Sequence, residues 1–368
     1  MKIGVPKEIK VKEGRVAITP DGARYLIQKG HQVYVELDAG SESGFTNEQY
    51  EDAGVQIVSA AAAWAVDLVV KVKEPLESEY KYLDGQIVFT YFHLAGMTSS
   101  LTQELLKKGI TAIAYETLED EHGRLPLLAP MSAVAGNMAT LMGCYYLAKF
   151  NQGKGVQLGK VLGRRHGKIV IIGDGVVGQH AAQVACGMGA YVFVGGIDSA
   201  TMQKIKTGLL PDAEFFLSSP ETISEHIKDA DVVVGAVLIH GAKAPKIITE
   251  DMIKSMAEGS VVVDVSIDQG GCIETSRPTT HSDPVFIKHG VIHYCVANMP
   301  GAYPRTSTIA LADATLPYIL KIADAGKEFL LADESLIKAV NICDGKITCK
   351  AVAEGLGMLN NYQSIDKF

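Results

Sequence analysis

The sequence of 368 residues predicts an α/β protein built from two doubly wound, mostly parallel sheets. Short apolar runs rich in β-branched residues alternate with helical patterns, which is typical of parallel sheets covered by helices. This alternation occurs twice, on either side of a long uncharged segment. The length suits two domains of roughly 150 residues each, and a hydrophobic content of 47% with 21% charged residues excludes general disorder.

The first alternating series fills the N-terminal third of the chain. Thr19 and Gly30 mark the expected start and end of one helix, and Thr46 and Gly54 mark those of a second. Helix caps separated by apolar runs indicate strands connected by helical crossovers. The expected strands are Ile3–Val5, Gln32–Leu37, Val55–Val58, Leu68–Val72 and Ile87–Tyr91.

The segment Leu125–Ala148 contains no formally charged residue and is long enough to span a bilayer. It includes two prolines, an asparagine and two glycines, so we expect a buried helix of a soluble protein from about Pro130 to Phe150. Residues 151–167 are rich in glycine and basic residues and are expected to form a loop.

The second alternating series follows that loop. The tail from Thr308 to Gly357 is expected to be helical, with a kink or break at Pro317. The expected helices of the second series include Ala181–Met188 and Ile248–Met256. Its expected strands are Lys168–Ile172, Tyr191–Val194, Ala213–Phe216, Asp231–Val237, Ser260–Val265 and Val291–Val296.

Charge and cysteine usage limit the possible partners. The chain has 34 basic and 42 acidic residues and a formal net charge of −8, which argues against a nucleic-acid or anionic-membrane partner. The six cysteines include no C-x-x-C pair, and no histidine cluster has metal-ligand spacing. The N-terminal residues lack the apolar core of a signal peptide. We therefore expect a cytoplasmic protein with reduced thiols and no metal site.

A G-x-G-x-x-G motif follows the apolar strand Lys168–Ile172 and directly precedes a helical pattern. In this context Gly173 permits a tight turn, Gly175 admits a pyrophosphate close to the backbone, and Gly178 allows strand and helix to pack closely. The helix N-terminus then presents free N–H groups to the phosphates. The motif predicts a dinucleotide site in a Rossmann-like domain; the alternative is a glycine-rich turn that binds nothing.

The next strand lacks the acid that usually bonds the ribose hydroxyls at its end. Gly196 occupies that position, and Asp198 follows two residues later. Asp198 is predicted to reach the ribose, or else to be a solvated loop residue. No arginine occurs between Gly178 and Asp231 to bind a 2′-phosphate, which favours NAD over NADP. On this interpretation Gly196→Asp should tighten NAD binding.

Candidate catalytic side chains follow the ends of several strands, where open α/β sheets bind ligands. Lys71 and Lys73 close one strand and could hold a carbonyl or carboxylate, or could be solvated. His93 ends another and could act as a general acid/base, or could be a satisfied core histidine. Arg15 could bind a carboxylate bidentately. In the second series Asp264, Ser266 and Asp268 follow a strand and could lie near a nicotinamide or cap a turn.

Eight segments, spread in order over the chain, together resemble the alanine dehydrogenase family, which also includes pyridine nucleotide transhydrogenase components. The resemblance implies reversible, NAD-dependent oxidative deamination of L-alanine to pyruvate and ammonium. The segments are Gly4–Glu8, Arg15–Pro20, Lys71–Pro75, His93–Ala95, Leu128–Ser132, Gly173–Gly178, Asp268–Gly271 and Val296–Pro300.

The resemblance also implies roles for individual residues. Arg15 and Lys73 would hold the substrate's carboxylate and carbonyl oxygen, His93 would be the general acid/base, and Asp268 would be a second catalytic group near the nicotinamide. With Asp198 added from its spacing, the expected cofactor contacts are Ser132, Gly173, Gly175, Val176, Val177, Gly178, Asp198, Val237, Leu238, Val265, Ser266, Ile267, Asp268, Arg277, Val296, Ala297, Asn298 and Met299.

The family's domain organisation implies that residues 1–128 and 304–368 form a discontinuous substrate domain, and residues 129–303 the NAD-binding domain. It also implies a homohexamer. One alternative is the NAD-binding component of a proton-pumping transhydrogenase, which should lack the equivalents of Lys73 and His93. Saccharopine-type dehydrogenases and a non-catalytic NAD(H)-binding protein are the others.

Overall fold

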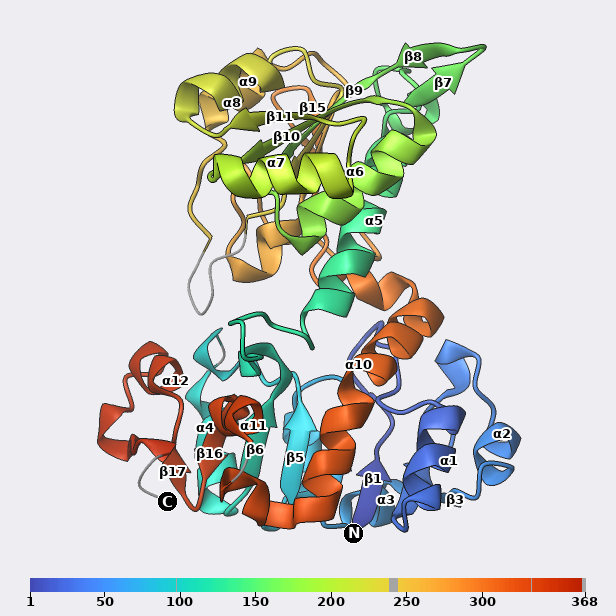
Figure 1. The fold of residues 1–368 in the computed structure, drawn as a ribbon, viewed down its shortest axis with the longest axis vertical. Helices are drawn as coiled ribbons and strands as arrows, with labels where there is room; N and C mark the ends of the chain where they lie inside the picture. The colour runs from blue at the N-terminus through green and yellow to red at the C-terminus, as the bar shows by residue number, and fades with distance from the viewer. Residues whose placement is uncertain (97, 238–243, 332, 366–368) are drawn as a thin grey trace. The chain divides into compact units, whose positions relative to one another are not determined.

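A computed structural model of the chain describes residues 1–96, 98–237, 244–331 and 333–365. The chain divides into two compact units, one of Met1–Met131 with Tyr303–Phe368 and the other of Ser132–Ala302. The blue N-terminal and red C-terminal segments in Figure 1 belong to the same unit, which is therefore discontinuous in sequence.

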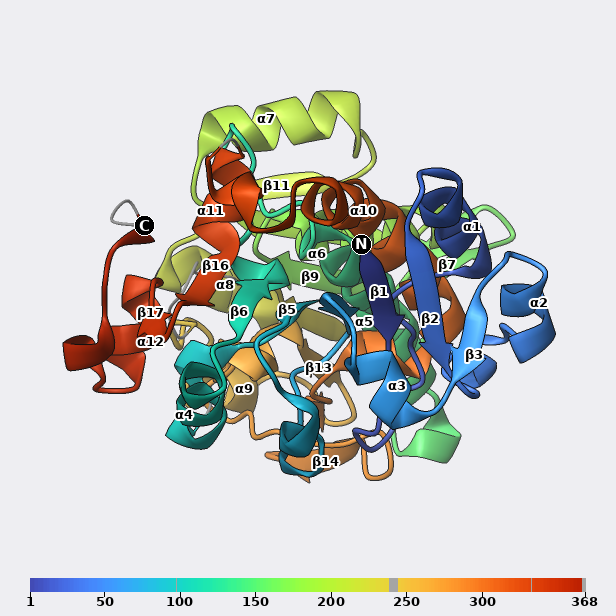
Figure 2. The ribbon, with the colours of Figure 1, turned by 90° about the horizontal axis from the view of Figure 1, so that it is seen from below.

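The first unit is built on one sheet, which has eight strands among the described residues, in the order β17-β16-β6-β5-β4-β1-β2-β3. The six strands from the N-terminal segment are parallel, whereas β16 is antiparallel to β6 and to β17. Figure 2 shows β1, β2 and β3 side by side at one end of this sheet. The strands are β1 (Lys2–Val5), β2 (Gln32–Glu36), β3 (Gln56–Val58), β4 (Leu68–Val70), β5 (Ile87–Thr90), β6 (Thr111–Ala114), β16 (Val340–Cys343) and β17 (Lys346–Ile347).

Two helices of the first unit begin at the expected caps, Thr19 and Thr46. The Thr19 hydroxyl accepts a hydrogen bond from Gly22 N (3.1 Å), and Pro20 occupies the first helical turn of α1. Thr46 and Gln49 form a capping box at α2. The helices are α1 (Pro20–Gln28), α2 (Asn47–Glu51), α3 (Ala60–Trp64), α4 (Ser99–Lys107), α10 (Pro304–Ala325), α11 (Glu334–Ala339) and α12 (Lys350–Gly355).

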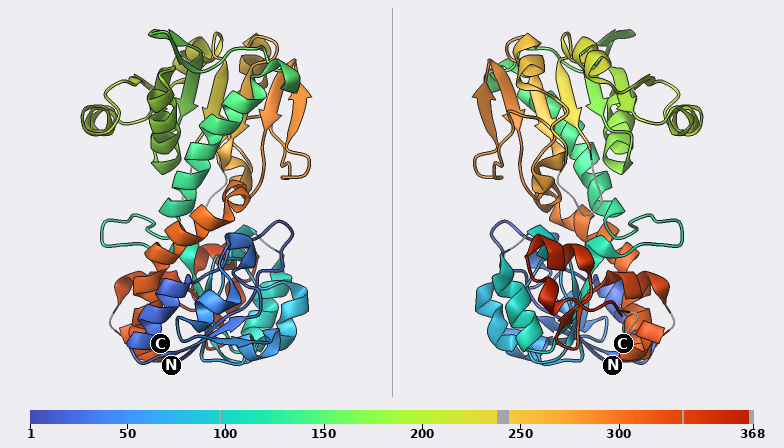
Figure 3. Two further views of the ribbon diagram at one scale, coloured as in Figure 1. Left: turned by 90° about the vertical axis from the view of Figure 1, so that its right-hand side faces the viewer. Right: turned by 90° about the vertical axis from the view of Figure 1, so that its left-hand side faces the viewer.

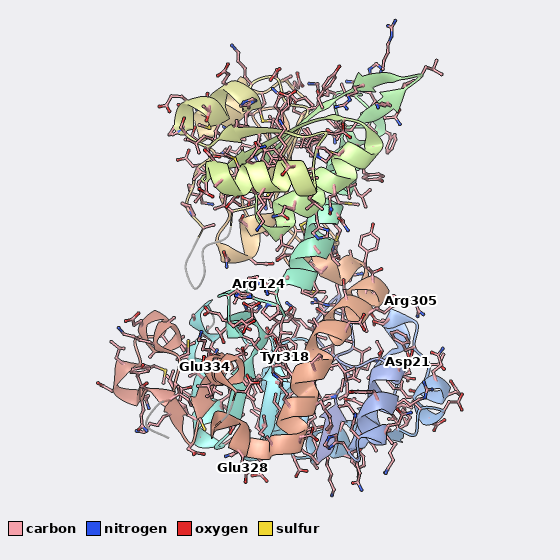
Figure 4. All side chains as sticks on the ribbon, viewed as in Figure 1. Asp21, Arg124, Arg305, Tyr318, Glu328 and Glu334 are labelled. Carbon is pink, nitrogen blue, oxygen red and sulfur yellow. The ribbon has the colours of Figure 1, made fainter. Side chains whose placement is uncertain are left out.

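The C-terminal segment completes the core of the first unit. Ile342 and Ile347 are fully buried in one apolar cluster with Val88 and Ala112. Arg305, which is labelled in Figure 4, lies at the start of α10. Its Nη1 donates to the carbonyl oxygens of Ser43 (3.1 Å) and Gly44 (2.9 Å). The two segments of the unit therefore share both a core and a hydrogen-bond network.

The second unit carries a sheet in the order β11-β10-β9-β12-β13-β15-β14, which is seven strands within the described ranges. All neighbours are parallel except β14 and β15. The strand order reverses between β9 and β12, and ligands bind at the carboxyl ends of strands at such a switch point. The strands are β9 (Lys168–Ile172), β10 (Tyr191–Gly196), β11 (Glu214–Leu217), β12 (Val232–Gly235), β13 (Val261–Asp264), β14 (Val285–Lys288) and β15 (Val291–Tyr294).

The central strands of this sheet are apolar runs because helices cover both faces. Val232–Gly235 and Val261–Asp264 are buried along their whole length. The two side views in Figure 3 show helices on opposite sides of these strands. The helices are α5 (Ala129–Tyr146), which contains the boundary between the units, α6 (Val176–Met188), α7 (Ser199–Gly208), α8 (Pro220–Ile227) and α9 (Glu250–Ser255).

These observations confirm the predicted fold class and correct several of its details. Residues 159–166 form the hairpin β7 (Gly159–Val161) and β8 (Arg164–His166) instead of a loop. The C-terminal tail contains two strands, and α10 continues through Pro317 without a break. No helix in the described part of the chain combines the length and apolarity needed to cross a membrane.

Candidate active site

Three predicted substrate-site residues of the first unit follow adjacent parallel strands. Arg15 follows β1, Lys73 follows β4 and His93 follows β5, and these strands are neighbours in the order β5-β4-β1. Since the strands are parallel, their carboxyl ends lie along one edge of the sheet. The segments that follow these strands therefore lie at the same edge, where Arg15 interacts electrostatically with Tyr91 and Glu8.

Arg15 is 2% exposed and is held by a carboxylate that the sequence analysis did not single out. Its Nε and Nη2 donate to Glu13 Oε1 (2.6 Å) and Oε2 (2.5 Å), and Nη1 lies 3.0 Å from Met131 Sδ. Burial lowers the pKa of Arg15, but the hydrogen bonds and charge of Glu13 outweigh burial and hold that pKa above its usual value. The guanidinium is thus a fixed, fully charged group.

Lys71 is part of a buried charge cluster, and Lys73 lies at its rim. The Nζ of Lys71 lies 3.3 Å from Glu8 Oε2 and 3.0 Å from Glu79 Oε1, and its side chain is 1% exposed. Glu8 also accepts hydrogen bonds from the backbone N–H groups of Val72 (2.7 Å) and Lys73 (3.2 Å). Burial lowers the pKa of Lys71, but the charges of Glu8 and Glu79 outweigh it and raise that pKa. This cluster fixes the backbone from which Lys73 projects.

His93 is exposed and has a backbone φ of +50°, a left-handed conformation that is rare for residues other than glycine. Its backbone N–H donates to Glu116 Oε1 (2.6 Å), and its ring stacks on Tyr91 with centroids 5.7 Å apart. The alternative of a satisfied core histidine is therefore wrong. Such strained residues concentrate at functional sites, at a cost of about 1–3 kcal/mol each.

The glycine loop of the second unit has the geometry that the motif predicts. Gly173 has φ +115°, and a Cβ there would collide with the carbonyl oxygen of Ala236. A Cβ on Gly178 would collide with the carbonyl oxygen of Gly173. Gly175 precedes the first residue of α6, where no side chain caps the helix. The N–H groups at Val176 and Val177 begin the helix, so they lie where a phosphate would bind.

A turn after β13 carries the predicted residues Val265, Ser266, Ile267 and Asp268 as a 3₁₀ helix, Val265–Gln269. The Ser266 hydroxyl donates to the carbonyl oxygen of Val237 (2.7 Å), which joins two predicted cofactor segments. Asn298, with φ +59°, donates from its backbone N–H to Asp268 Oδ2 (3.3 Å). The fold thus brings this turn together with the segment Val296–Met299.

Asp264 holds this turn in place. It is 0% exposed and accepts hydrogen bonds from the backbone N–H groups of Ser266 (3.1 Å), Cys272 (3.3 Å) and Ile273 (3.1 Å). Gly270, at φ +92°, ends the turn in the left-handed region that favours glycine. Asp264 was predicted beyond the strand as a possible catalytic group, whereas its buried carboxylate ends the strand and organises the turn.

Known proteins match the chain along its whole length. Two family models match it, described as "Alanine dehydrogenase/PNT, N-terminal domain" over residues 4–135 and "Alanine dehydrogenase/PNT, C-terminal domain" over residues 139–350. The chain belongs to the alanine dehydrogenase/PNT family. An alanine dehydrogenase of Staphylococcus haemolyticus is 49% identical over 100% of this chain and 98% of its own length.

Solved structures agree with this membership of the alanine dehydrogenase/PNT family. One, described as L-alanine dehydrogenase, has a TM-score of 0.94 and 43% identity, covering 98% of this chain and 100% of its own. A transhydrogenase of Sinorhizobium meliloti has a TM-score of 0.82 over 95% of this chain and 100% of its own. Its identity of 24% supports only a shared fold.

The remaining predicted cofactor residues of this family member are not among the contacts described above. Ser132 is half-buried in the first turns of α5, and Arg277 is exposed and stacks over the ring of Phe286 at 4.3 Å. Asp198 caps α7 by accepting a hydrogen bond from Thr201 N (2.8 Å). Leu238 lies outside the described residues.

Removing the charge of Asp264 should loosen the turn that carries Asp268. In Asp264→Asn the amide nitrogen cannot accept the hydrogen bonds that one carboxylate oxygen accepts. We therefore expect the free energy of unfolding to fall by about 1–3 kcal/mol. Thermal unfolding measures this change, with the exposed Asp251→Asn as control. An unfolding temperature equal to that of the control would contradict the role.

Proposed function

We propose that this chain catalyses the NAD-dependent, reversible oxidative deamination of L-alanine to pyruvate and ammonium. The arrangement of Arg15, Lys73 and His93 at the carboxyl ends of three adjacent strands carries the proposal. Membership of the alanine dehydrogenase/PNT family supports it, as does the alanine dehydrogenase name of a relative at 49% identity.

The glycine loop fits the pyrophosphate of NAD. A Cβ on Gly175 would meet no atom within 4 Å, so the backbone there borders open space. The uncapped N-terminus of α6 supplies donors and a positive dipole end to that space. Val237, Ser266 and Asn298 would contact the rest of the cofactor, by analogy with the family. When bound, NAD accepts the hydride that leaves the Cα of alanine.

The side chains of the first unit would bind and orient the amino acid. The guanidinium of Arg15, fixed by Glu13, would pair with the substrate carboxylate. The ammonium group of Lys73 would bond the carbonyl oxygen of pyruvate. Holding the carboxylate and the adjacent carbonyl oxygen fixes the carbon that corresponds to the Cα of alanine, and such positioning lowers the entropic part of the barrier.

Hydrolysis of the imine formed from alanine requires a group that moves protons near neutral pH. An imidazole nitrogen of His93 would take a proton from the attacking water and later return it to the departing ammonia. Its exposed side chain can exchange protons with solvent. Asp268, held by the N–H of Asn298, would be the second catalytic group.

Absorbance at the NADH wavelength tests the proposed function directly. We expect NADH formation with L-alanine and NAD, and NADH consumption with pyruvate and ammonium. A panel with serine, 2-aminobutyrate and other small amino acids defines the substrate preference, and NADP replaces NAD in a parallel set. Absence of turnover with every amino acid, combined with tight NADH binding, would instead indicate a non-catalytic NAD(H)-binding protein.

Arg15→Lys keeps the positive charge but loses the planar fork that pairs with a carboxylate. We expect the KM for alanine to rise by about tenfold or more, while the Kd of NADH stays unchanged. Steady-state kinetics and an NADH titration measure the two quantities. Arg24→Lys, at an exposed pair with Asp21, is the matched control. An unchanged KM for alanine would reject the carboxylate role.

The assembly and compartment are also proposed from the family. We propose a homohexamer in the cytoplasm, and sedimentation of the purified chain tests its size. The six cysteines, all among the described residues, are free thiols, which suits a reducing compartment.

A further inference from the structure

The strand-end position that usually carries the ribose-binding acid is glycine in this chain, and its side-chain space is already filled. An ideal Cβ on Gly196 would lie 2.5 Å from Asp174 Oδ2 and 2.8 Å from Asp174 Cγ. It would also lie 2.8 Å from Met202 Cγ. The carboxylate of Asp174 therefore reaches, from the glycine loop, the place where an acid at the end of β10 would project.

Asp174 is available for a ligand, because no hydrogen bond or ion pair joins its carboxylate to another of the described residues. It is half-buried between Gly173 and Gly175. Burial raises the pKa of Asp174, and the charge of Asp198 raises it further, so hydroxyl donors at this carboxylate would stabilise its ionised form.

Asp198 is in the opposite situation. Its carboxylate accepts the N–H of Thr201 at 2.8 Å as the N-cap of α7. Hydrogen bonds from the Thr201 side chain and then its backbone N–H lower the pKa of Asp198, so the side chain is a satisfied cap. To bind a ribose, the Asp198 carboxylate would have to give up its hydrogen bond with the N–H of Thr201 at the start of α7.

On the basis of the NAD-dependent function proposed above, we infer that Asp174 supplies the carboxylate that holds the adenosine ribose of the cofactor, and that residue 196 is glycine because Asp174 occupies its side-chain space. The ligand class is a dinucleotide with free 2′- and 3′-hydroxyls, which donate to a carboxylate. A 2′-phosphate at the same place would be repelled.

This inference reverses the expected effect of Gly196→Asp. In Gly196→Asp the new Cβ would collide with Asp174 Oδ2. The new carboxylate would also lie close to that of Asp174, and the two negative charges would repel each other. We therefore expect Gly196→Asp alone to weaken NADH binding. Combined with Asp174→Ala, it should restore binding, because the acid then projects from the strand end.

Fluorescence titrations of NADH and NADPH test this pair of positions without depending on turnover. We expect Asp174→Ala and Asp174→Asn to raise the Kd of NADH by about 10- to 100-fold, and to lower the ratio of the NADPH Kd to the NADH Kd. Asp251→Ala, at an exposed pair with Lys254, is the control and should leave the Kd of NADH near that of the wild type. Asp198→Ala tests the competing candidate for the ribose-binding acid, and we expect it to raise that Kd less than Asp174→Ala does. Thermal unfolding shows that each variant is folded, and Asp174→Asn preserves the side-chain volume if the alanine variant does not fold.

The outcomes separate this inference from the proposed function. If the wild type binds NADH and both Asp174 variants bind it equally well, the role of Asp174 is overturned and the proposed function stands. A larger loss in Asp198→Ala than in Asp174→Ala would also overturn it. If the wild type binds neither nucleotide, the NAD-dependent function itself fails. Restored NADH binding in the Asp174→Ala, Gly196→Asp double variant supports the coupling of the two positions.

Discussion

His93→Ala should lower kcat for alanine deamination by about 10²- to 10⁴-fold, the contribution typical of a positioned general acid/base. The Kd of NADH should remain near that of the wild type, because the glycine loop belongs to the other compact unit. Steady-state kinetics and an NADH titration on the same preparation measure both effects. His122→Ala replaces another exposed histidine and serves as control.

The backbone at residue 93 requires a second variant. Alanine at φ +50° is strained, so a loss of activity could reflect a shifted loop. Asparagine tolerates left-handed backbone and cannot transfer protons near neutral pH, so His93→Asn should lose as much activity as His93→Ala with less disturbance of stability. If His93→Asn retained near-normal turnover, His93 would not be the acid/base.

Lys71→Met should give the largest loss of stability, about 3–5 kcal/mol, because it leaves the buried carboxylates of Glu8 and Glu79 without their cation. Glu8 is 8% exposed and Glu79 is 4% exposed, so water cannot replace the lost partner. Urea unfolding measures the change. Lys107→Met breaks an exposed pair with Glu104 and should change stability by less than about 1 kcal/mol.

The loss of folding stability caused by Lys71→Met should depend on pH. Burial already raises the folded-state pKa of Glu8 above its unfolded value, and removing Lys71 raises it further. A carboxyl with a raised folded-state pKa binds its proton more tightly when folded. Its destabilising effect is therefore complete above the folded-state pKa and disappears as pH falls toward the unfolded value. An equal loss at acidic and at neutral pH would contradict this account.

The sequence predicted the fold class because buried parallel strands are apolar along their whole length. Runs such as Val232–Gly235 and Val261–Asp264 have few alternatives, and Thr19 and Thr46 mark helix starts by local hydrogen bonds. The strands β16 and β17 escaped prediction because they are four and two residues long. β16 is defined by pairing with β6, far away in sequence, and β17 by pairing with β16.

The candidate site was predictable residue by residue only where a motif carries its own geometry, as at Gly173. Partners across the fold were not predictable. Glu13 is close to Arg15 in sequence, yet nothing in the sequence shows that its carboxylate takes two donors of the guanidinium. Gly196 indicated a missing acid, but only the folded structure shows that Asp174 reaches that place.

The discontinuity of the first unit has a consequence for synthesis on the ribosome. Residues 132–302 emerge as a complete unit before the C-terminal segment exists, and can fold while translation continues. The N-terminal segment lacks β16, β17 and α10 at that stage, and Val88 and Ala112 have not yet met Ile342 and Ile347. The nascent N-terminal segment therefore keeps part of its apolar surface exposed until β16 and β17 are made, and such exposed surface is prone to aggregation.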